Sequence, residues 1–332
     1  MRLPINGFTA LMLGAIVLAS VVPVQGASAE ALAVTGSVAV GLLFFFHGAA
    51  LSRQQVIAGA SHWRLHALIT TMTFVVFPIL VLPVTLFPES WIPGDLALGF
   101  IYLGVLPSAV TSSIAFTAMA KGNVPAAICS AAASNVFGMM LTPFLLLLLA
   151  QTTGAGFDVA GALRDIVLQL LLPFFAGHAI RPWVMQLIDK YKPLLAKYDQ
   201  GVILLIVYSA FSHSVVSGLW QKLPVASVVL TIALCFLLLF VVILLTRLVV
   251  RAMGLDAADE AAVVFCGSKK SLASGLPMAK VLFAGHPGFG MIVLPIMCYN
   301  QIQIFVGAFV ARYYGRRIAA EADQTIDGVR SQ

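Results

Sequence analysis

Residues 223–246 read LPVASVVLTIALCFLLLFVVILLT and contain no charged side chain. A helix needs about 20 apolar residues to cross the hydrocarbon core of a bilayer, so this stretch alone is long enough to span one. Further uncharged runs of comparable length lie on both sides of it, at 31–52, 65–88, 96–120, 122–157, 200–221 and 281–311. Only 10% of the chain is charged, against about 25% in soluble domains. We therefore predict an all-α integral membrane protein, with the lipid bilayer as its surroundings.

Ten transmembrane helices account for the whole pattern, within a single transmembrane transporter domain over 1–332. We expect the spans at 5–24, 32–51, 65–87, 96–119, 123–150, 161–183, 201–220, 224–248, 258–284 and 289–314. The first span has an alternative, because Arg2, the apolar residues 11–22 and the small residues 27–29 are also typical of a cleaved signal peptide. We favour a helix, because the repeat described below needs five spans in each half.

The placement of basic residues predicts the orientation. Lys and Arg gather in cytoplasmic loops of membrane proteins, so the net charge of +6 gives no reason to expect a nucleic-acid partner. One side of the expected topology holds 14 of them: Arg2, Arg53, Arg64, Lys121, Arg181, Lys190, Lys192, Lys197, Arg247, Arg251, Arg312, Arg316, Arg317 and Arg330. The other side holds Arg164 and Lys222. We expect an inner (plasma) membrane protein with both termini in the cytoplasm, including a C-terminal tail at 315–332.

A faint internal repeat links spans four and nine. Residues 112–121 read SSIAFTAMAK and residues 271–280 read SLASGLPMAK, so both have a serine followed seven residues later by Met-Ala-Lys. These are the fourth spans of two five-span halves, at about 1–151 and 158–318. Because five is odd, the halves would have opposite topology, which is the inverted-repeat plan of many secondary transporters.

The same two spans carry residues that break helices or offer oxygen ligands. In span four, Leu106-Pro107 precedes clustered hydroxyls, and in span nine residues 266–271 read CGSKKS. Non-helical backbone at membrane depth is tolerated only where protein or a water-filled cavity satisfies it. We therefore expect two unwound segments that bind a solute or an ion; the alternative is a regular helix whose hydroxyls bond to its own carbonyls. The candidate ligands are Ser108, Thr111, Ser112, Ser113, Ser130, Ser134, Asn135, Ser268, Lys269, Lys270, Ser271 and Asn300.

The adjacent lysines, Lys269 and Lys270, are the most unusual feature of span nine. An ammonium at the bilayer centre costs about 2.5–3.5 kcal/mol on insertion scales, so it normally faces a cavity or a partner. None of the 13 acidic residues falls in the centre of an expected span. The lysines would then meet backbone carbonyls or an anionic substrate, lose a proton, or reach outward to the interface. We expect at least one of them, preferably Lys270, to face the substrate cavity.

Other function classes find little support. The chain has no HExxH, GxSxG or phosphate-loop motif, so we do not expect an enzyme, a cofactor or a firmly bound metal. A cation/proton antiporter is disfavoured because no carboxylate is expected inside the membrane. His47 and His213 are candidate proton carriers, although a lone buried histidine is more often only hydrogen-bonded.

Several stretches resemble the bile acid:sodium symporter superfamily, and within it the orphan branch that includes the vertebrate sodium/bile acid cotransporter 7. They are FFFHGAAL at 44–51, KGN at 121–123, LTP at 141–143, FCGSKKSL at 265–272, GLPM at 275–278 and VLFAGH at 281–286. The resemblance implies ten helices, a panel and a core domain, crossing broken helices four and nine, and sodium-coupled uptake of a small organic anion. Members of this branch are also associated with calcium homeostasis, which leaves a membrane regulator without solute transport as the alternative function.

The chain departs from the better-known members where they bind two sodium ions. Where those carry a glutamate, a glutamine and hydroxyls, it has Phe265 or Cys266, Lys269, Ala127 and Ala131. Ser112 and Ser113 remain as candidate sodium ligands. An ammonium at Lys269 or Lys270 could instead stand where sodium would, which would leave proton-coupled or uncoupled movement of the anion. The sequence leaves open the substrate, the coupling ion, the direction of transport and the oligomeric state.

Overall fold

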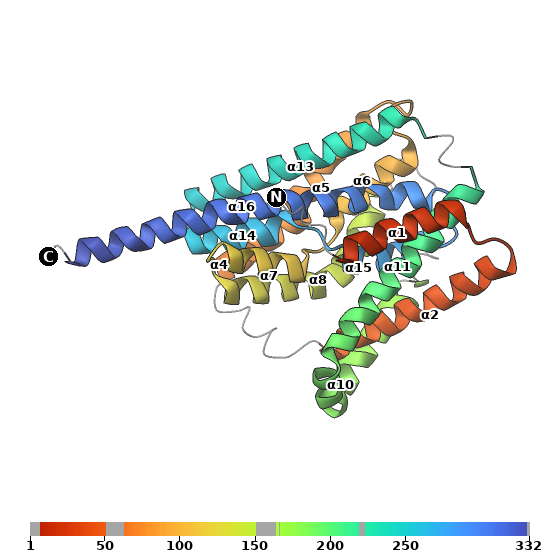
Figure 1. The fold of residues 1–332 in the computed structure, drawn as a ribbon, viewed down its shortest axis with the longest axis horizontal. Helices are drawn as coiled ribbons and strands as arrows, with labels where there is room; N and C mark the ends of the chain where they lie inside the picture. The colour runs from red at the N-terminus through yellow and green to blue at the C-terminus, as the bar shows by residue number, and fades with distance from the viewer. Residues whose placement is uncertain (1–6, 51–62, 151–163, 166, 219–222, 331–332) are drawn as a thin grey trace.

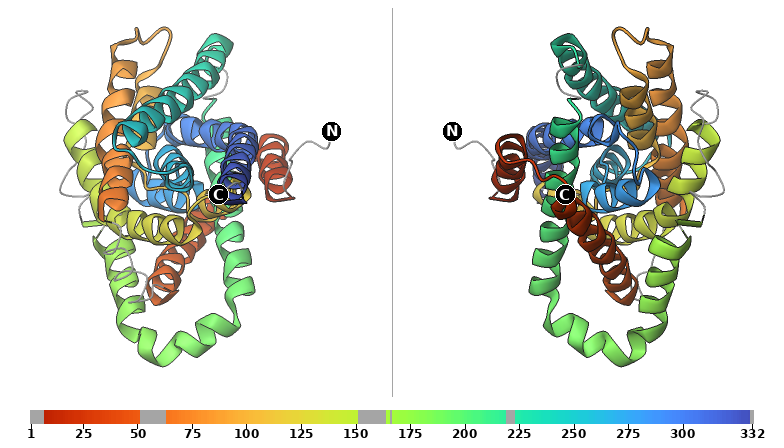
Figure 2. Two further views of the ribbon diagram at one scale, coloured as in Figure 1. Left: turned by 90° about the vertical axis from the view of Figure 1, so that its left-hand side faces the viewer. Right: turned by 90° about the vertical axis from the view of Figure 1, so that its right-hand side faces the viewer.

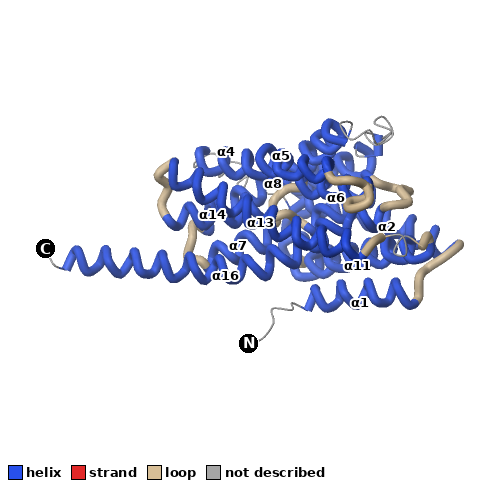
Figure 3. Tube along the Cα trace, turned by 90° about the horizontal axis from the view of Figure 1, so that it is seen from above, coloured by secondary structure: helices blue, strands red, loops and turns tan. Residues whose placement is uncertain are grey.

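The computed structural model describes residues 7–50, 63–150, 164–165, 167–218 and 223–330, and within them it contains helices and no strand (Figure 3). The helices are α1 (Gly7–Val21), α2 (Ala27–Ala50), α4 (Trp63–Thr71), η1 (Met72–Val76), α5 (Phe77–Val81), η2 (Leu82–Leu86), α6 (Gly94–Val105), α7 (Val110–Met119), α8 (Val124–Ala150), η4 (Val167–Leu171), α10 (Leu172–Lys190), α11 (Lys192–Val216), α13 (Val225–Ala252), α14 (Ala257–Ser268), α15 (Leu272–Leu282) and α16 (Phe289–Arg330). The all-helical fold class is thereby confirmed.

Seven of the described helices or helix runs are long and apolar enough to cross a membrane, and α6 with α7, bent by 59° at their break, makes an eighth if the pair is one span. The helix α1 is shorter, and α14 and α15 have 12 and 11 residues. The arrangement as ten spans in two inverted repeats stays a prediction. The repeat boundary near 151–158, and Arg2, Arg53 and Lys222 from the orientation argument, lie outside the described residues.

The contacts between helices divide the described chain into two groups. We call α1, α2, η4, α10 and α11 the panel, because α2 packs on α10 and α11 while α1 packs on α11. We call the helices from α4 to α8 and from α13 to α16 the core, where α6 packs on α16 and α7 packs on α8 and α14. Figure 2 shows α10 and α11 diverging from their connection as a V beside the core. In Figure 1 the end of α16 extends beyond the other helices.

Two glycines allow the closest approach within the panel. A Cβ added to Gly48 of α2 would overlap the carbonyl oxygen of Phe174, and one added to Gly177 of α10 would overlap that of Phe45. Each glycine thus faces the backbone of the other helix. Only residues without a side chain permit this contact, and it fixes the end of α2 that carries His47.

A buried carboxylate holds one end of the core together. Glu260, in the first turn of α14, is 1% exposed. It lies 2.7 Å from Arg317 of α16 and 3.3 Å from Arg247 of α13, and it accepts a hydrogen bond from the hydroxyl of Tyr314 at 2.6 Å. The carboxylate is buried while its arginine partners are partly exposed, and the cluster joins α13, α14 and α16 at one end of the core.

Local chemistry explains why α6 and α14 end where they do. Pro107 restricts the residue before it to extended backbone, and Leu106 has φ −68° and ψ 151°. At the other break Lys269 is extended, and the Ser271 hydroxyl accepts a hydrogen bond from the Ser274 N–H, which starts α15. The two breaks meet, because the Ser271 N–H donates to the Pro107 carbonyl at 2.9 Å.

Candidate functional site

At the first break, side chains from α8 replace the lost helical hydrogen bonds. The Ser134 hydroxyl accepts from the Ser108 N–H at 3.0 Å, and Asn135 donates its side-chain amide to the Ser108 carbonyl at 2.9 Å. The hydroxyl of Thr142 donates to the Val105 carbonyl at 2.7 Å. Unpaired backbone groups are costly when buried, so these three α8 residues make the break tolerable.

At the second break, one glutamine of α16 replaces the lost helical hydrogen bonds. The Gln303 side chain accepts from the Lys270 N–H at 2.8 Å and donates to the Lys270 carbonyl at 2.9 Å. The side-chain amide thus provides the acceptor and the donor that the backbone of a regular helix would have provided. The Tyr299 hydroxyl donates to the Ser268 carbonyl at 2.7 Å, which completes the support of this segment from α16.

The Lys270 ammonium lies among three carbonyl oxygens in the core. It donates to Gly104 and Leu106 at 2.7 Å each and to Thr73 at 2.9 Å, and it lies 4.0 Å from the centre of the Phe77 ring. Carbonyls at the end of a helix carry partial negative charge, which favours a cation. Lys270 therefore occupies the kind of oxygen cluster that would otherwise suit a free cation.

The three carbonyls are available for identifiable reasons. Around Thr73 the backbone is π-helical, where the carbonyl would accept from the residue five positions on, and that residue is Pro78, which has no N–H. The carbonyls of Gly104 and Leu106 lie at the end of α6, which Pro107 terminates. Pro78 and Pro107 thus leave these carbonyls free to accept hydrogen bonds from Lys270.

The Lys269 ammonium points to the opposite side of the second break. It donates to the Gln303 carbonyl at 2.9 Å and lies 4.2 Å from the centre of the Phe116 ring. A Cβ on Gly307 would come within 2.8 Å of this nitrogen, so the glycine leaves room for it. The two lysines are thus buried within the protein and bonded to carbonyls, which was one of the alternatives for them.

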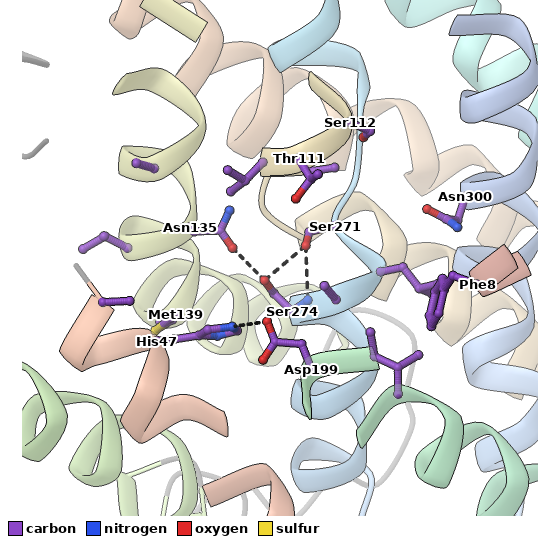
Figure 4. A pocket seen from close by; sticks show the side chains of 18 of the residues that line it. Phe8, His47, Thr111, Ser112, Asn135, Met139, Asp199, Ser271, Ser274 and Asn300 are labelled. Atoms are coloured by element: carbon purple, nitrogen blue, oxygen red, sulfur yellow. Dashed lines mark hydrogen bonds and ion pairs between the residues drawn. The ribbon is translucent and has the colours of Figure 1, made fainter. Parts of the chain in front are cut away.

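A cavity of about 450 Å³ lies at the boundary between panel and core (Figure 4). The core side is formed by the N-terminal turns of α7, with Thr111 and Ser112, and of α15, with Ser271 and Ala273. First-turn N–H groups have no partner within their helix, and helix N-termini favour negative charge. Two such ends facing one cavity make it suited to an anion.

The panel side of the cavity carries a hydrogen-bonded histidine–carboxylate pair that the sequence argument missed. His47 Nε2 of α2 lies 3.3 Å from Asp199 Oδ2 of α11, and both line the cavity (Figure 4). We expected Asp199 just outside a span beginning at 201, but α11 begins at Lys192. Pro193 follows directly, and proline is favoured at the first helical position, so this signal could have placed Asp199 inside the helix.

The structure brings only some of the expected ligands together. Those that line the cavity are Thr111, Ser112, Asn135, Ser271 and Asn300. Lys269 and Lys270 do not, which differs from the expectation for Lys270. Ser108, Ser113, Ser130, Ser134 and Ser268 also lie elsewhere: Ser113 donates to the Phe265 carbonyl, Ser130 bonds His66, and Ser268 donates to its own helix. Ser274, Phe8 and Asp199 are cavity residues that were not anticipated.

The two candidate sodium ligands, Ser112 and Ser113, do not face one common site. The Ser113 hydroxyl is directed to the carbonyl of Phe265, away from Ser112, which lines the cavity. The carbonyl cluster formed by the end of α6 and by Thr73 is already bonded to an ammonium. Ser112 and Ser113 therefore do not converge on one hard-cation site, and the carbonyl cluster is filled by the Lys270 side chain.

Two broken helices that cross inside a helical bundle, beside a cavity between two helix groups, are typical of integral membrane transporters. The chain belongs to the SBF-like CPA transporter family, whose model matches residues 6–316. The resemblance to the bile acid:sodium symporter superfamily is confirmed by its relatives.

Three relatives show how far the similarity extends. The chain is 46% identical over 313 residues to an uncharacterised protein of Pseudomonas aeruginosa, PA2026, covering 94% of this chain and 93% of that one. It is 44% identical over 316 residues to the "Putative symporter YfeH" of Escherichia coli, covering 94% of each. It is 29% identical over 277 residues to the sodium/bile acid cotransporter 7 of Danio rerio, covering 82% of this chain and 81% of that one.

Proposed function

We propose that this protein is a secondary active transporter that moves a small organic anion by alternating access. The observation that carries the proposal is the cavity of about 450 Å³ faced by the N-terminal ends of α7 and α15. That volume is within the range of about 300–1,000 Å³ for small-molecule sites. The lining mixes apolar groups such as Phe174 with the polar groups of Thr111 and Asn135, which suits an anion with an apolar body, such as a sterol acid or a sulfate ester.

The division into panel and core gives the movement a physical basis. The crossing is internally cross-linked through Ser271, Gln303 and Lys270, so the core moves as one body. The cavity lies where the core meets the panel, and a sliding of one against the other exposes it first to one side of the membrane and then to the other. Two inverted five-helix repeats, at about 1–151 and 158–318, would make the two end states of similar energy.

Sodium is the coupling ion that the family resemblance implies, but no step of the proposed cycle depends on it. The Lys270 side chain fills the carbonyl cluster at the crossing and is a covalent part of the chain. It cannot be released on one side of the membrane, so any coupling to an ion would depend on another group.

We infer that both termini are cytoplasmic and that the protein resides in the inner membrane. The count of 14 against 2 basic residues supports this. The arginines around Glu260, which are Arg247, Arg251 and Arg317, lie at one end of the core. We assign this basic end to the cytoplasmic side.

The test uses Ala273, an exposed residue in the first turn of α15 that lines the cavity. Ala273→Asp places a negative charge where we expect the anion, while a carboxylate near a helix N-terminus favours the fold. Ala273→Asn has nearly the same size and no charge. Uptake of cholate, 4-nitrophenyl sulfate and succinate into proteoliposomes is measured for all three proteins.

We expect saturable uptake of at least one of the three anions by the wild type and by Ala273→Asn. Ala273→Asp should lose it by tenfold or more. Equal uptake by Ala273→Asp and Ala273→Asn would remove the cavity as the anion site. No uptake by the wild type, with the protein correctly folded, would favour a membrane regulator instead.

A further inference from the structure

The pair formed by His47 and Asp199 has no role in holding the crossing together. Both residues belong to the panel: His47 lies in the last turn of α2 and Asp199 in the second turn of α11. They face the core across the cavity (Figure 4). The exposed fractions of their side chains are 27% and 30%. The pair is therefore partly open to the cavity, where water and substrate can reach it.

The charged and titratable neighbours of His47 are few in the part of the chain that the structure describes. From α10, the Arg181 side chain donates to the Ala49 carbonyl, and the backbone nitrogen of His178 lies beside Gly48. From α11, the Tyr198 hydroxyl donates to the Ala39 carbonyl, and from α15, Lys280 reaches α2 only near Gly36. The segment η4 offers no titratable side chain. Asp199 is the one ionisable group within ion-pair distance of His47 among the described residues.

Proton binding to this pair changes the charge of the cavity wall by one unit. Histidine is the side chain whose charge ordinarily changes between pH 5 and 8. With His47 neutral, Asp199 gives this wall a charge of −1, which opposes an anion. With His47 protonated, the pair is neutral overall and the helix ends of α7 and α15 dominate the potential.

We propose that the His47–Asp199 pair is the proton-binding site of this transporter and that one proton enters with each anion. The inference rests on the proposed function of the cavity. The proton comes from the compartment to which the cavity is open, binds at His47 in the pair, and leaves to the other compartment after the panel and core have moved and the anion has dissociated. Anion binding and proton binding then strengthen each other equally, because linkage is reciprocal.

The size of the effect follows from one charge near the bound anion. At about 10 Å and an effective dielectric constant near 20, one unit charge changes affinity by roughly tenfold or more. Dissociation constants for cholate and 4-nitrophenyl sulfate are measured from pH 5.5 to 8.5 in the absence of sodium. Calorimetry in buffers of different ionisation enthalpy counts the protons taken up on binding.

Three variants separate the pair from other titrating groups. His47→Gln keeps the carboxylate and should bind weakly at every pH, like the wild type at pH 8.5. Asp199→Asn removes the opposing charge and should bind tightly even at pH 8.5. His213→Gln, on the same helix α11 but outside the cavity lining, is the matched control and should behave as the wild type.

The wild type should bind its anion about tenfold more tightly at pH 5.5 than at pH 8.5, with a fraction of a proton taken up per anion in between. A pH gradient, inside alkaline, should then drive accumulation in proteoliposomes of wild type and not of His47→Gln. If His47→Gln binds the anion with an unchanged pH profile, the proton site is wrong while the transporter stands. If no anion binds the folded wild type at any pH, the proposed function fails and this inference fails with it.

Discussion

The two breaks of the crossing both interrupt helical hydrogen bonds, but they differ in the groups that they leave unpaired. The first, around Pro107, lacks one N–H group and leaves carbonyls of α6 without helical partners. The second contains two lysines, whose ammonium groups are donors in excess. Each break by itself would be costly in a membrane, but the Lys270 ammonium and the Ser271 N–H of the second break donate to carbonyls of the first. Lys269 donates instead to the Gln303 carbonyl of α16. The difference teaches that the pair of breaks is one structural unit.

The most damaging change to this unit should be Lys270→Met. Three buried carbonyls, of Thr73, Gly104 and Leu106, would lose a charged donor. Each unsatisfied group costs about 1–3 kcal/mol, partly offset because no ammonium has to be desolvated. We expect a loss of about 3–5 kcal/mol, measured as chemical unfolding of the protein in mixed micelles.

Lys270→Ala tests whether the three carbonyls can bind a free cation, because the substitution leaves a space beside them. If this cluster is a cation site filled by a side chain, sodium should raise the unfolding temperature of Lys270→Ala by mass action. N-methylglucamine at equal ionic strength is the control, and the wild type should respond to neither. A sodium response as large in the wild type as in Lys270→Ala would show that sodium binds elsewhere.

The side chains that bond the two breaks should also differ in how much they contribute to the free energy of unfolding. Gln303→Leu would leave both the N–H and the carbonyl of Lys270 unpaired in a fully buried place, at about 2–4 kcal/mol. Asn135→Leu would free the Ser108 carbonyl and the Ser274 hydroxyl, but Asn135 borders the cavity, where water can replace it. We expect about 1–2 kcal/mol for Asn135→Leu in the same unfolding measurement, and equal losses would contradict this difference.

Much of this crossing was accessible from the sequence, because Pro107 breaks the helix within an uncharged run and the lysine pair places charge within an otherwise apolar span. The directions of the lysines were not. They depend on which carbonyls are free, and the Thr73 carbonyl is free only because the backbone is π-helical before Pro78, nearly two hundred residues away. Hydropathy likewise marked the end of an uncharged run at Asp199, although the helix begins earlier. Charge patterns locate apolar runs, whereas helix starts depend on local residues such as Pro193.

The second lysine should matter less than the first. Lys269→Met would remove one hydrogen bond, to the Gln303 carbonyl, and one close aromatic contact, with Phe116. The Gln303 carbonyl lies inside α16 and retains its helical partner. We expect a loss of about 1–2 kcal/mol, smaller than that of Lys270→Met. A loss as large as that of Lys270→Met would mean that the carbonyl cluster around Lys270 has no special role.

The smallest effect should come from Ser108→Ala, although Ser108 was a candidate ligand. Its buried hydroxyl has no hydrogen-bond partner among the described residues, whereas its N–H is bonded to Ser134. Replacing the hydroxyl removes an unsatisfied polar group, so stability should change by less than about 0.5 kcal/mol or rise slightly. Ser134→Ala is the matched comparison, since it leaves the Ser108 N–H unpaired and should cost about 1–2 kcal/mol. Should Ser108→Ala cost more than Ser134→Ala, the hydroxyl would have a partner such as a bound ion, and the first break would have to be counted as part of the ligand site.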